Sequence, residues 1–225
     1  MPATLTLRGM LRDRGAVLAS RGGEPVAAHY GSAATELALC VRAVGVAWRP
    51  ELAAVTLDAA PDAIDSLCER VTGERLAPGG ALREGAAWWA RSPRLDQLTL
   101  LCPHDALGRV LSRSLESARS IGLRVSDRSA DTAVIEIVGR RCWRLLAELG
   151  AGEVRAATPF SELVLAGHAT SLLIASEVGA FVLAPATAGC EAWCAIELAG
   201  GPLGLGRVGH EALERYSVAR AAIAA

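Results

Sequence analysis

The side chains that could ligate a metal ion or act as nucleophiles are spread along the chain without a shared spacing. Six cysteines form no CxxC pair, and they are Cys40, Cys68, Cys102, Cys142, Cys190 and Cys194. The histidines lie at no ligand spacing from them, and they are His29, His104, His168 and His210. We therefore predict no metal site, and we expect the thiols to be reduced and packed beside apolar neighbours.

Two adjacent tryptophans could offer a flat surface to a ligand. Trp88 and Trp89 begin a predicted strand, in which successive side chains point to opposite faces. One of the pair could therefore line a cleft while the other enters the core. Trp143 and Trp193 fit helical stripes instead, and we predict that both are core residues.

Predicted helices and strands alternate along the whole chain. Helices are expected near 32–44, 61–73, 103–115, 140–150, 188–198 and from about 208. Strands are expected near 53–57, 88–89, 95–102, 133–137, 162–167, 169–175 and 180–184. No linker or low-complexity tract divides them. We predict an α+β fold with antiparallel sheets, each covered by helices on one face.

One order of elements occurs twice. Residues 46–73 and 125–152 each carry a polar turn, a β-rich run, a break at Pro or Gly and an amphipathic helix, about 79 positions apart. The identical pairs at this offset are Val46/Val125, Arg49/Arg128, Ala54/Ala133, Val55/Val134, Leu67/Leu146, Glu69/Glu148 and Gly73/Gly152. A repeat this long is not a solenoid period. We predict a single domain, 1–225, whose related halves, about 1–120 and 121–225, enclose a central cleft for a small-molecule ligand.

The charge balance argues against some classes of partner. A formal net charge of −1 gives no electrostatic footprint for nucleic acid or an anionic membrane. Charged residues and glycines interrupt every apolar run before it reaches the length of a membrane span. The first residues lack the apolar core of an export signal. We therefore expect a cytoplasmic protein with no nucleic-acid and no membrane partner.

Several segments, taken in order, resemble the glycine-cleavage T-protein superfamily. This group includes tetrahydrofolate-dependent aminomethyltransferases and the γ subunits of heterotetrameric sarcosine oxidases. VAAHYGSAATELALCVRAVGV (26–46) resembles the family's H-[FY]-G…E…G-[LV] motif, and RLAPGG (75–80) resembles L-x-P-G. RSPRLDQLTLL (91–101), DRSADTAVIEIVG (127–139) and GLGRVGHEALERYSVARA (204–221) are similar to three later motifs. Because the chain stops after the last one, we expect the short form without the family's C-terminal β-barrel.

The resemblance implies tetrahydrofolate as the ligand of the cleft and gives roles to individual residues. Asp96 matches the carboxylate that family transferases place beside the reactive nitrogens of folate, where an anion stabilises a cationic one-carbon unit. It is the catalytic candidate. The cofactor-binding candidates are Tyr30, Trp88 and Glu177. The first two could stack on a flat ring, and Glu177 lies in the segment similar to the family's G-E-x-G-[YF]-E motif.

Two family contacts are missing from the matching positions. The last glutamate of that motif, which holds the amidine edge of the pterin, falls on Ala180 or Phe181. The arginine of the tail motif falls on Ser217. Arg215 and Arg220 lie two and three positions away, and we expect them to point elsewhere on the helix. The pterin site is therefore expected to be degenerate.

Three functions remain open from the sequence. Our leading hypothesis is a tetrahydrofolate-binding, aminomethyltransferase-like protein of one-carbon metabolism, with chemistry that is altered or lost. The second is a non-catalytic subunit or pseudoenzyme that assembles with a partner subunit of a larger oxidase. The third is a cleft repurposed for another small molecule in a biosynthetic pathway. Fold and function are separate here, since one fold hosts many activities.

Overall fold

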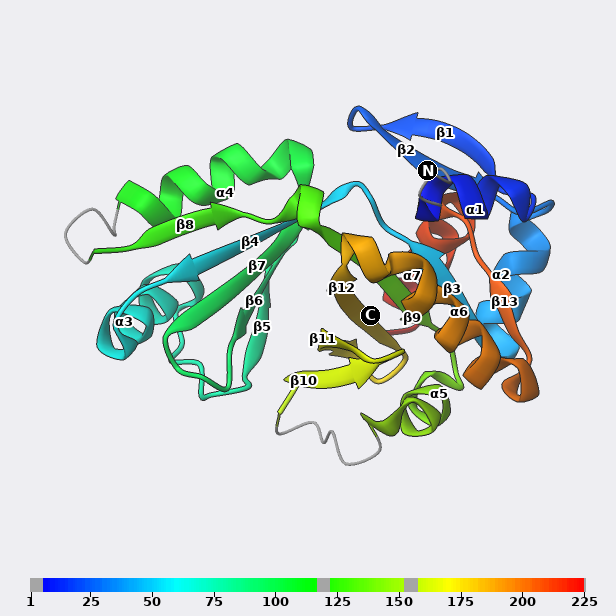
Figure 1. Cartoon of the computed structure of the whole chain (residues 1–225). Helices are drawn as coiled ribbons and strands as arrows, with labels where there is room; N and C mark the ends of the chain where they lie inside the picture. The colour runs from blue at the N-terminus through cyan, green and yellow to red at the C-terminus, as the bar shows by residue number, and fades with distance from the viewer. Residues whose placement is uncertain (1–5, 117–121, 152–157, 225) are drawn as a thin grey trace, which may run out of the picture.

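Two β-sheets face each other, and helices cover their outer sides (Figure 1). The structure is a computed structural model that describes residues 6–116, 122–151 and 158–224. The predicted α+β class with mainly antiparallel sheets is confirmed. Among the described residues, no helix is long and apolar enough to cross a membrane.

The five-stranded sheet has the order β5-β6-β7-β4-β8, and every neighbouring pair is antiparallel. Its strands are β4 (Leu52–Asp58), β5 (Ala81–Glu84), β6 (Ala87–Arg91), β7 (Gln97–Pro103) and β8 (Arg124–Asp127). Helices α3 (Pro61–Thr72) and α4 (His104–Glu116) pack on its outer face. The apolar stripe predicted for α3 is buried there, because Ile64, Leu67 and Cys68 are fully covered.

The six-stranded sheet has the order β10-β11-β12-β9-β3-β13. Its strands are β3 (Val44–Trp48), β9 (Thr132–Val138), β10 (Phe160–Leu165), β11 (His168–Ser176), β12 (Gly179–Pro185) and β13 (Leu205–Arg207). Only the β13–β3 pair is parallel among the described strands. Helices α1 (Leu7–Asp13), α5 (Cys142–Leu146) and α6 (Gly189–Gly200) cover its outer face, with Trp193 fully buried as predicted.

The inner faces of the two sheets meet through an apolar layer. Leu52 and Leu101 of the five-stranded sheet pack with Val134, Leu173 and Phe181 of the six-stranded sheet. These positions follow the two-residue alternation of strands, so every second side chain points into the space between the sheets. This layer fixes the distance between the sheets, and any cavity between them must lie at its ends.

A third group of elements closes one side of the molecule. Strands β1 (Val17–Arg21) and β2 (Glu24–His29) form an antiparallel hairpin. Helix α7 (His210–Ala224) contacts both β2 and helix α2 (Ala33–Arg42). The buried carboxylate of Glu36 joins them: Oε1 accepts from the Tyr30 amide at 2.6 Å, and Oε2 accepts from the Gly209 amide at 2.7 Å. Two charge-assisted hydrogen bonds thus hold the start of α7 to the end of β2.

The repeat seen in the sequence corresponds to equivalent elements. The first copy is β3, β4 and α3, and the second is β8, β9 and α5 followed by a π-helical turn, Ala147–Ala151. The short strand of each copy pairs with the long strand of the other copy. The short strand β3 pairs with β9, and the short strand β8 pairs with β4. The two sheets therefore exchange a strand across the expected boundary near residue 120.

Six strands, β1, β2, β3, β5, β8 and β13, and the α-helix α1 were not predicted from the sequence. Val44–Trp48 is a short apolar run directly after a helix, so its periodicity does not separate it from α2. The β1–β2 hairpin turns at Gly22 and Gly23, both with positive φ, a turn signal that the prediction missed. Helix α1 has only seven residues, too few to show a clear period.

Gly139 gives a direct test of backbone packing at the end of β9. Its φ is +127°, and a Cβ there would lie 2.7 Å from the carbonyl oxygens of Cys40 and Ala43. We expect Gly139→Ala to lower the free energy of unfolding by about 1–3 kcal/mol in urea titrations. The control Gly108→Ala, in α4 with no atom near the new methyl group, should instead stabilise by up to about 1 kcal/mol. Equal effects of the two substitutions would contradict this packing.

Candidate ligand cavity between the sheets

A cavity of about 590 Å³ lies at one end of the space between the sheets, against helix α7. One wall comes from β6 and β7 of the five-stranded sheet, and the opposite wall comes from β9 and β12 of the six-stranded sheet. Helix α7 and Arg21 of β1 complete it. The volume is within the range of small-molecule sites in proteins.

The inner part of the cavity is aromatic and apolar. Trp88 is half-buried and lines it, while Trp89 is fully buried in the outer core, so the two adjacent rings do face opposite sides of the strand. Phe181 of β12 lines the opposite wall, and Tyr216 of α7 lines the side. The guanidinium carbon of Arg83 lies 5.8 Å from the centre of the Trp88 ring, a cation–π distance.

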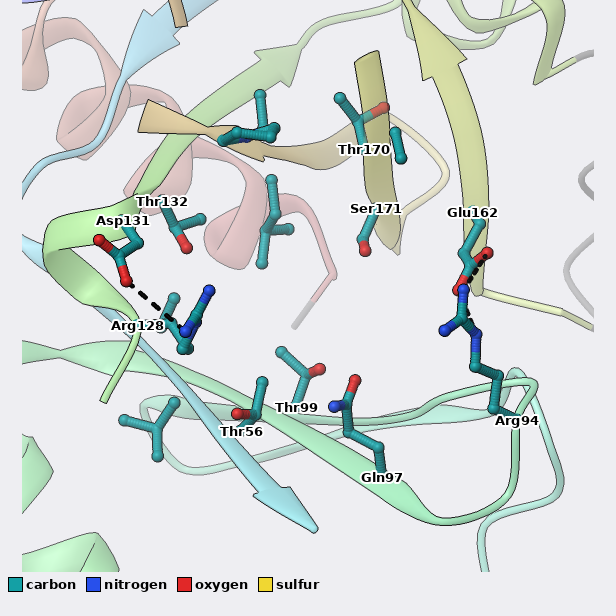
Figure 2. A pocket seen from close by; sticks show the side chains of 16 residues that line it. Thr56, Arg94, Gln97, Thr99, Arg128, Asp131, Thr132, Glu162, Thr170 and Ser171 are labelled. Atoms are coloured by element: carbon teal, nitrogen blue, oxygen red, sulfur yellow. Dashed lines mark hydrogen bonds and ion pairs between the residues drawn. The ribbon is translucent and has the colours of Figure 1, made fainter. Parts of the chain in front are cut away.

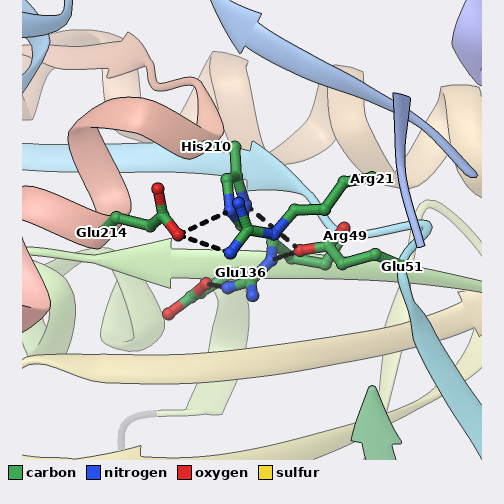
Figure 3. Close-up of polar contacts among 6 residues, drawn as sticks. All are labelled: Arg21, Arg49, Glu51, Glu136, His210 and Glu214. Atoms are coloured by element: carbon green, nitrogen blue, oxygen red, sulfur yellow. Dashed lines mark hydrogen bonds and ion pairs between the residues drawn. The ribbon is translucent and has the colours of Figure 1, made fainter. Parts of the chain in front are cut away.

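A chain of alternating charges forms another part of the lining (Figure 3). The Arg49 guanidinium donates to Glu136 and, at 2.5 Å, to Glu51. On the far side of Glu51, both ring nitrogens of His210 face carboxylates: Nδ1 lies 3.5 Å from Glu51 and Nε2 lies 3.4 Å from Glu214.

This chain reaches the β1–β2 hairpin. Arg21 of β1 donates to Glu214 of α7 at 2.5 Å. The contacts therefore link four parts of the fold: β1, α7, the turn between β3 and β4, and β9. A change at any one of these groups alters the charge seen by its neighbours.

Burial and neighbouring charges act against each other at Glu51. Burial alone would raise the pKa of this carboxyl group, but His210 and Arg49 outweigh it and lower the pKa from 4.5 to about 2. Burial likewise disfavours charge on Arg49, yet Glu136 and Glu51 hold its pKa above the ordinary value. The ion pair is therefore charged throughout the neutral range.

The predicted site residues do not converge on one place. Trp88 lines the cavity, and Glu177 lies exposed in the turn between β11 and β12, whose flanking residues Ser176 and Gly179 line it. Asp96 is exposed in the turn between β6 and β7, outside the cavity lining, and its carbonyl oxygen accepts from the Ala59 amide at 3.1 Å. The catalytic role that the resemblance gives Asp96 stays a prediction.

Tyr30 lies in a different pocket. It follows β2 and lines a hollow with Glu36, Glu197 and Arg207. Its hydroxyl is buried without a hydrogen-bond partner among the described residues, and burial raises the pKa of the phenol. Tyr30, which we expected beside a pterin, therefore lines a different pocket from Trp88.

The two positions where family contacts are missing do meet in the cavity. Of the two alternatives for the glutamate position, Phe181 lines the cavity and Ala180 is buried in the outer core. Ser217, at the arginine position, also lines the cavity. Glu136 lies directly opposite Phe181 on the neighbouring strand, so it brings a carboxylate beside the position where the glutamate is absent. Arg220, three residues after Ser217, also lines the cavity and donates to Ser176 Oγ at 3.1 Å. The expectation that Arg220 points elsewhere was wrong.

Both residues could have been found in the sequence. Residues at i and i+3 share a helix face, which relates Arg220 to Ser217. Glu136 stands between Ile135 and Ile137, which are fully buried on the outer face, so the alternation of the strand places its carboxylate on the inner face.

Most thiols are buried, whereas Cys194 is exposed on α6. In the described part of the chain, no group of three or more His, Cys, Asp or Glu side chains could hold a metal ion. Burial raises the pKa of the Cys40 and Cys142 thiols to about 12 and that of Cys102 to about 11. Such thiols are not thiolates at neutral pH, so they are structural.

Comparison with known proteins supports the fold assignment. No family model and no curated protein matches the sequence. The glycine cleavage system aminomethyltransferase T from Bartonella henselae superposes with a TM-score of 0.73 at 15% identity, over 94% of this chain and 61% of that chain. This is the T-protein fold. A chain of the heterotetrameric sarcosine oxidase from Corynebacterium sp. U-96 superposes with a TM-score of 0.58 at 18% identity, over 80% of this chain and 96% of that one.

The resemblance read from the sequence is thus confirmed at the level of fold. This chain spans about three fifths of the aminomethyltransferase that it matches. At these identities the match establishes the architecture, and the activities in the names of the two neighbours are not transferred by it.

Glu51 should control acid stability. Its folded pKa lies below the ordinary value, so its stabilising contribution is complete above about pH 4.5 and is lost as the pH falls toward 2. We expect Glu51→Gln to lower the free energy of unfolding at pH 7 by roughly 3 kcal/mol and to flatten its dependence on pH in that window. Urea titrations between pH 2 and 7 measure both effects.

The exposed Glu211, on α7, provides the control. Glu211→Gln removes the same charge and should change the free energy of unfolding by less than about 0.5 kcal/mol. An unchanged pH dependence in Glu51→Gln would contradict the ion-pair chain.

Proposed function

We propose that the cavity between the sheets binds a reduced folate. The observation that carries this proposal is the placement of Glu136 opposite Phe181, with Arg220 on the same helix face as Ser217. A carboxylate and a guanidinium thus stand beside the two positions where the family's contacts are missing. In this proposal, Glu136 and Arg220 take the roles of the two missing groups from adjacent elements.

The aromatic walls suit the flat part of such a ligand. Trp88 from one sheet and Phe181 from the other offer ring surfaces on opposite walls. Within the described part of the chain, Glu136 accepts from Arg49 through Oε2, which leaves Oε1 to accept from the ligand. The amidine edge of a pterin presents adjacent donors, so a carboxylate is its natural partner.

The charge of the lining suits the anionic tail of a folate. Four arginines and two glutamates line the cavity, namely Arg21, Arg49, Arg83, Arg220, Glu136 and Glu214. Arg83 and Arg220 are exposed and therefore lie at the rim, where a flexible carboxylate tail would reach them. The excess of positive charge favours an anion over a cation of the same size.

The proposal assigns binding to this chain and no transfer step. Asp96 lies outside the lining, and His210 is held between two carboxylates. The resemblance gives the role of the anion beside the reacting carbon to Asp96, which the proposed binding site does not include. The chain is therefore proposed as a folate-binding protein with the aminomethyltransferase fold.

Calorimetry with 5-formyltetrahydrofolate tests the proposal. We expect binding with a dissociation constant in the micromolar range or weaker, and we expect Glu136→Gln and Arg220→Gln each to weaken it by roughly tenfold, the effect of losing one charge-assisted contact. Arg215→Gln is the matched control, because Arg215 is exposed on α7 and does not line the cavity. No heat with any reduced folate would remove the proposal.

Asp96→Asn separates two placements of the ligand. If the folate binds in this cavity, the substitution leaves the dissociation constant unchanged, because Asp96 is exposed in another loop. A loss of binding in Asp96→Asn, with Glu136→Gln unaffected, would move the site to the β6–β7 turn, as the sequence resemblance implies.

A second proposal is that the chain is a subunit of a larger assembly. The supporting observation is that it covers 96% of a chain of a heterotetrameric oxidase. Purification from the native source, followed by size-exclusion chromatography, should then show the chain eluting with a partner subunit in fixed ratio. Elution of the chain by itself at native concentration would contradict a stable assembly.

A further inference from the structure

A second cavity, of about 280 Å³, lies at the other end of the space between the sheets (Figure 2). The cavity proposed for folate is lined by Leu101 and Phe181, and this one is lined by residues nearer the opposite ends of the same strands, Thr99 and Leu183. The apolar layer between the sheets separates the two cavities.

The inner faces of several strands change character at this end. On β4 the inward series runs from Leu52 and Ala54 to Thr56, and on β7 it runs from Leu101 to Thr99 and Gln97. Three strands of the other sheet change in the same way, from Leu173 to Ser171, from Val134 to Thr132 and from Phe160 to Glu162. Packing of two sheets requires apolar inner faces, so packing does not explain this polar end.

These polar groups are largely free to bind. Figure 2 shows Ser171 directed toward Thr56, Thr99 and Gln97 from the facing sheet. The hydroxyls of Thr56, Thr99 and Ser171 have no hydrogen-bond partner within the described residues. Gln97 donates from its amide nitrogen to Asp58 at 2.8 Å, which leaves its amide oxygen as an acceptor.

An ion pair stands on either side of this hydroxyl group. Glu162 holds Arg94 with two contacts, at 3.2 and 3.4 Å, on one side. Asp131 holds Arg128 with a single contact, at 3.6 Å, on the other. Arg128 therefore keeps most of its donors, and its backbone is fixed because its amide donates to the Ala54 carbonyl at 2.8 Å.

We propose that this cavity binds a small carboxylic acid that carries an amino or hydroxyl group. Its carboxylate would accept from Arg128, which is the least engaged cation of the lining, and its polar group would bind the hydroxyls of Thr99 and Ser171. The two arginines and two acidic residues cancel in charge, so a zwitterion or a small anion enters without a strong opposing field. The volume is about half that of the first cavity and lies at the lower end of the range for small-molecule sites.

Titration with L-serine and with glycolate, followed by amide chemical shifts in NMR spectra, tests the proposal. We expect saturable shifts at Thr99, Arg128 and Ser171 with both probes, and none with glycerol, which has hydroxyls but no carboxylate. Arg128→Gln should weaken binding by roughly tenfold. Arg124→Gln, an exposed arginine of β8 outside the lining, is the control and should bind as the parent chain does.

Ser171→Ala is a second variant that keeps the proposal testable if Arg128→Gln alters folding, and it should weaken binding several-fold. Saturable shifts that persist equally in both variants would overturn the proposal. Equal binding of glycerol would show a polyol site instead, and the absence of saturable shifts would show that the cavity holds water alone. None of these three outcomes depends on folate binding, which is measured separately with Glu136→Gln.

Discussion

The exchange of strands between the two copies of the repeat is the constraint on which the rest of the structure depends. Two equivalent turns carry the chain from one sheet to the other. The Arg49 amide donates to the Val134 carbonyl at 2.9 Å, and the Arg128 amide donates to the Ala54 carbonyl at 2.8 Å. The same internal hydrogen bond closes each turn. The Leu52 amide donates to the Arg49 carbonyl in one copy, and the Asp131 amide donates to the Arg128 carbonyl in the other.

Because each sheet contains a strand of both copies, two crossings of the chain join the sheets. The apolar layer then fills the middle of the inter-sheet space, and the cavities lie at its two ends. Arg49 and Arg128 occupy matching positions in the repeat, yet each lines a different cavity. Arg49 is partly buried between two carboxylates, and Arg128 is half-exposed with a single ion-pair contact. Matching positions of the repeat thus hold the same side chain in two distinct environments.

Much of the fold follows from the sequence, because local patterns carry it. The helix stripe of α3, the alternation of β9 and the turn at Gly73 are all local, and the structure has them where the pattern predicts. The exchange of strands is not local, since nothing in Val44–Trp48 says that its partner is β9. Short apolar runs become strands only when a partner is available.

The candidate site was harder to predict for a related reason. A motif match selected Asp96, but the turn before β7 directs that residue to solvent. Glu136 has no motif of its own, and its importance depends on two pairings made by the fold, with Phe181 across the strand and with Arg49 across the inner face. The role of a carboxylate in a strand can be inferred only when the residues that contact it are known.

The central claim is that the two sheets hold a reduced folate between their facing walls. A crystal structure of the chain soaked with 5-formyltetrahydrofolate tests it most directly. The account predicts the pterin between Trp88 and Phe181, with its amidine edge at Glu136 and its tail toward Arg220. A pterin bound beside Asp96, or an empty cavity at saturating ligand, would contradict it.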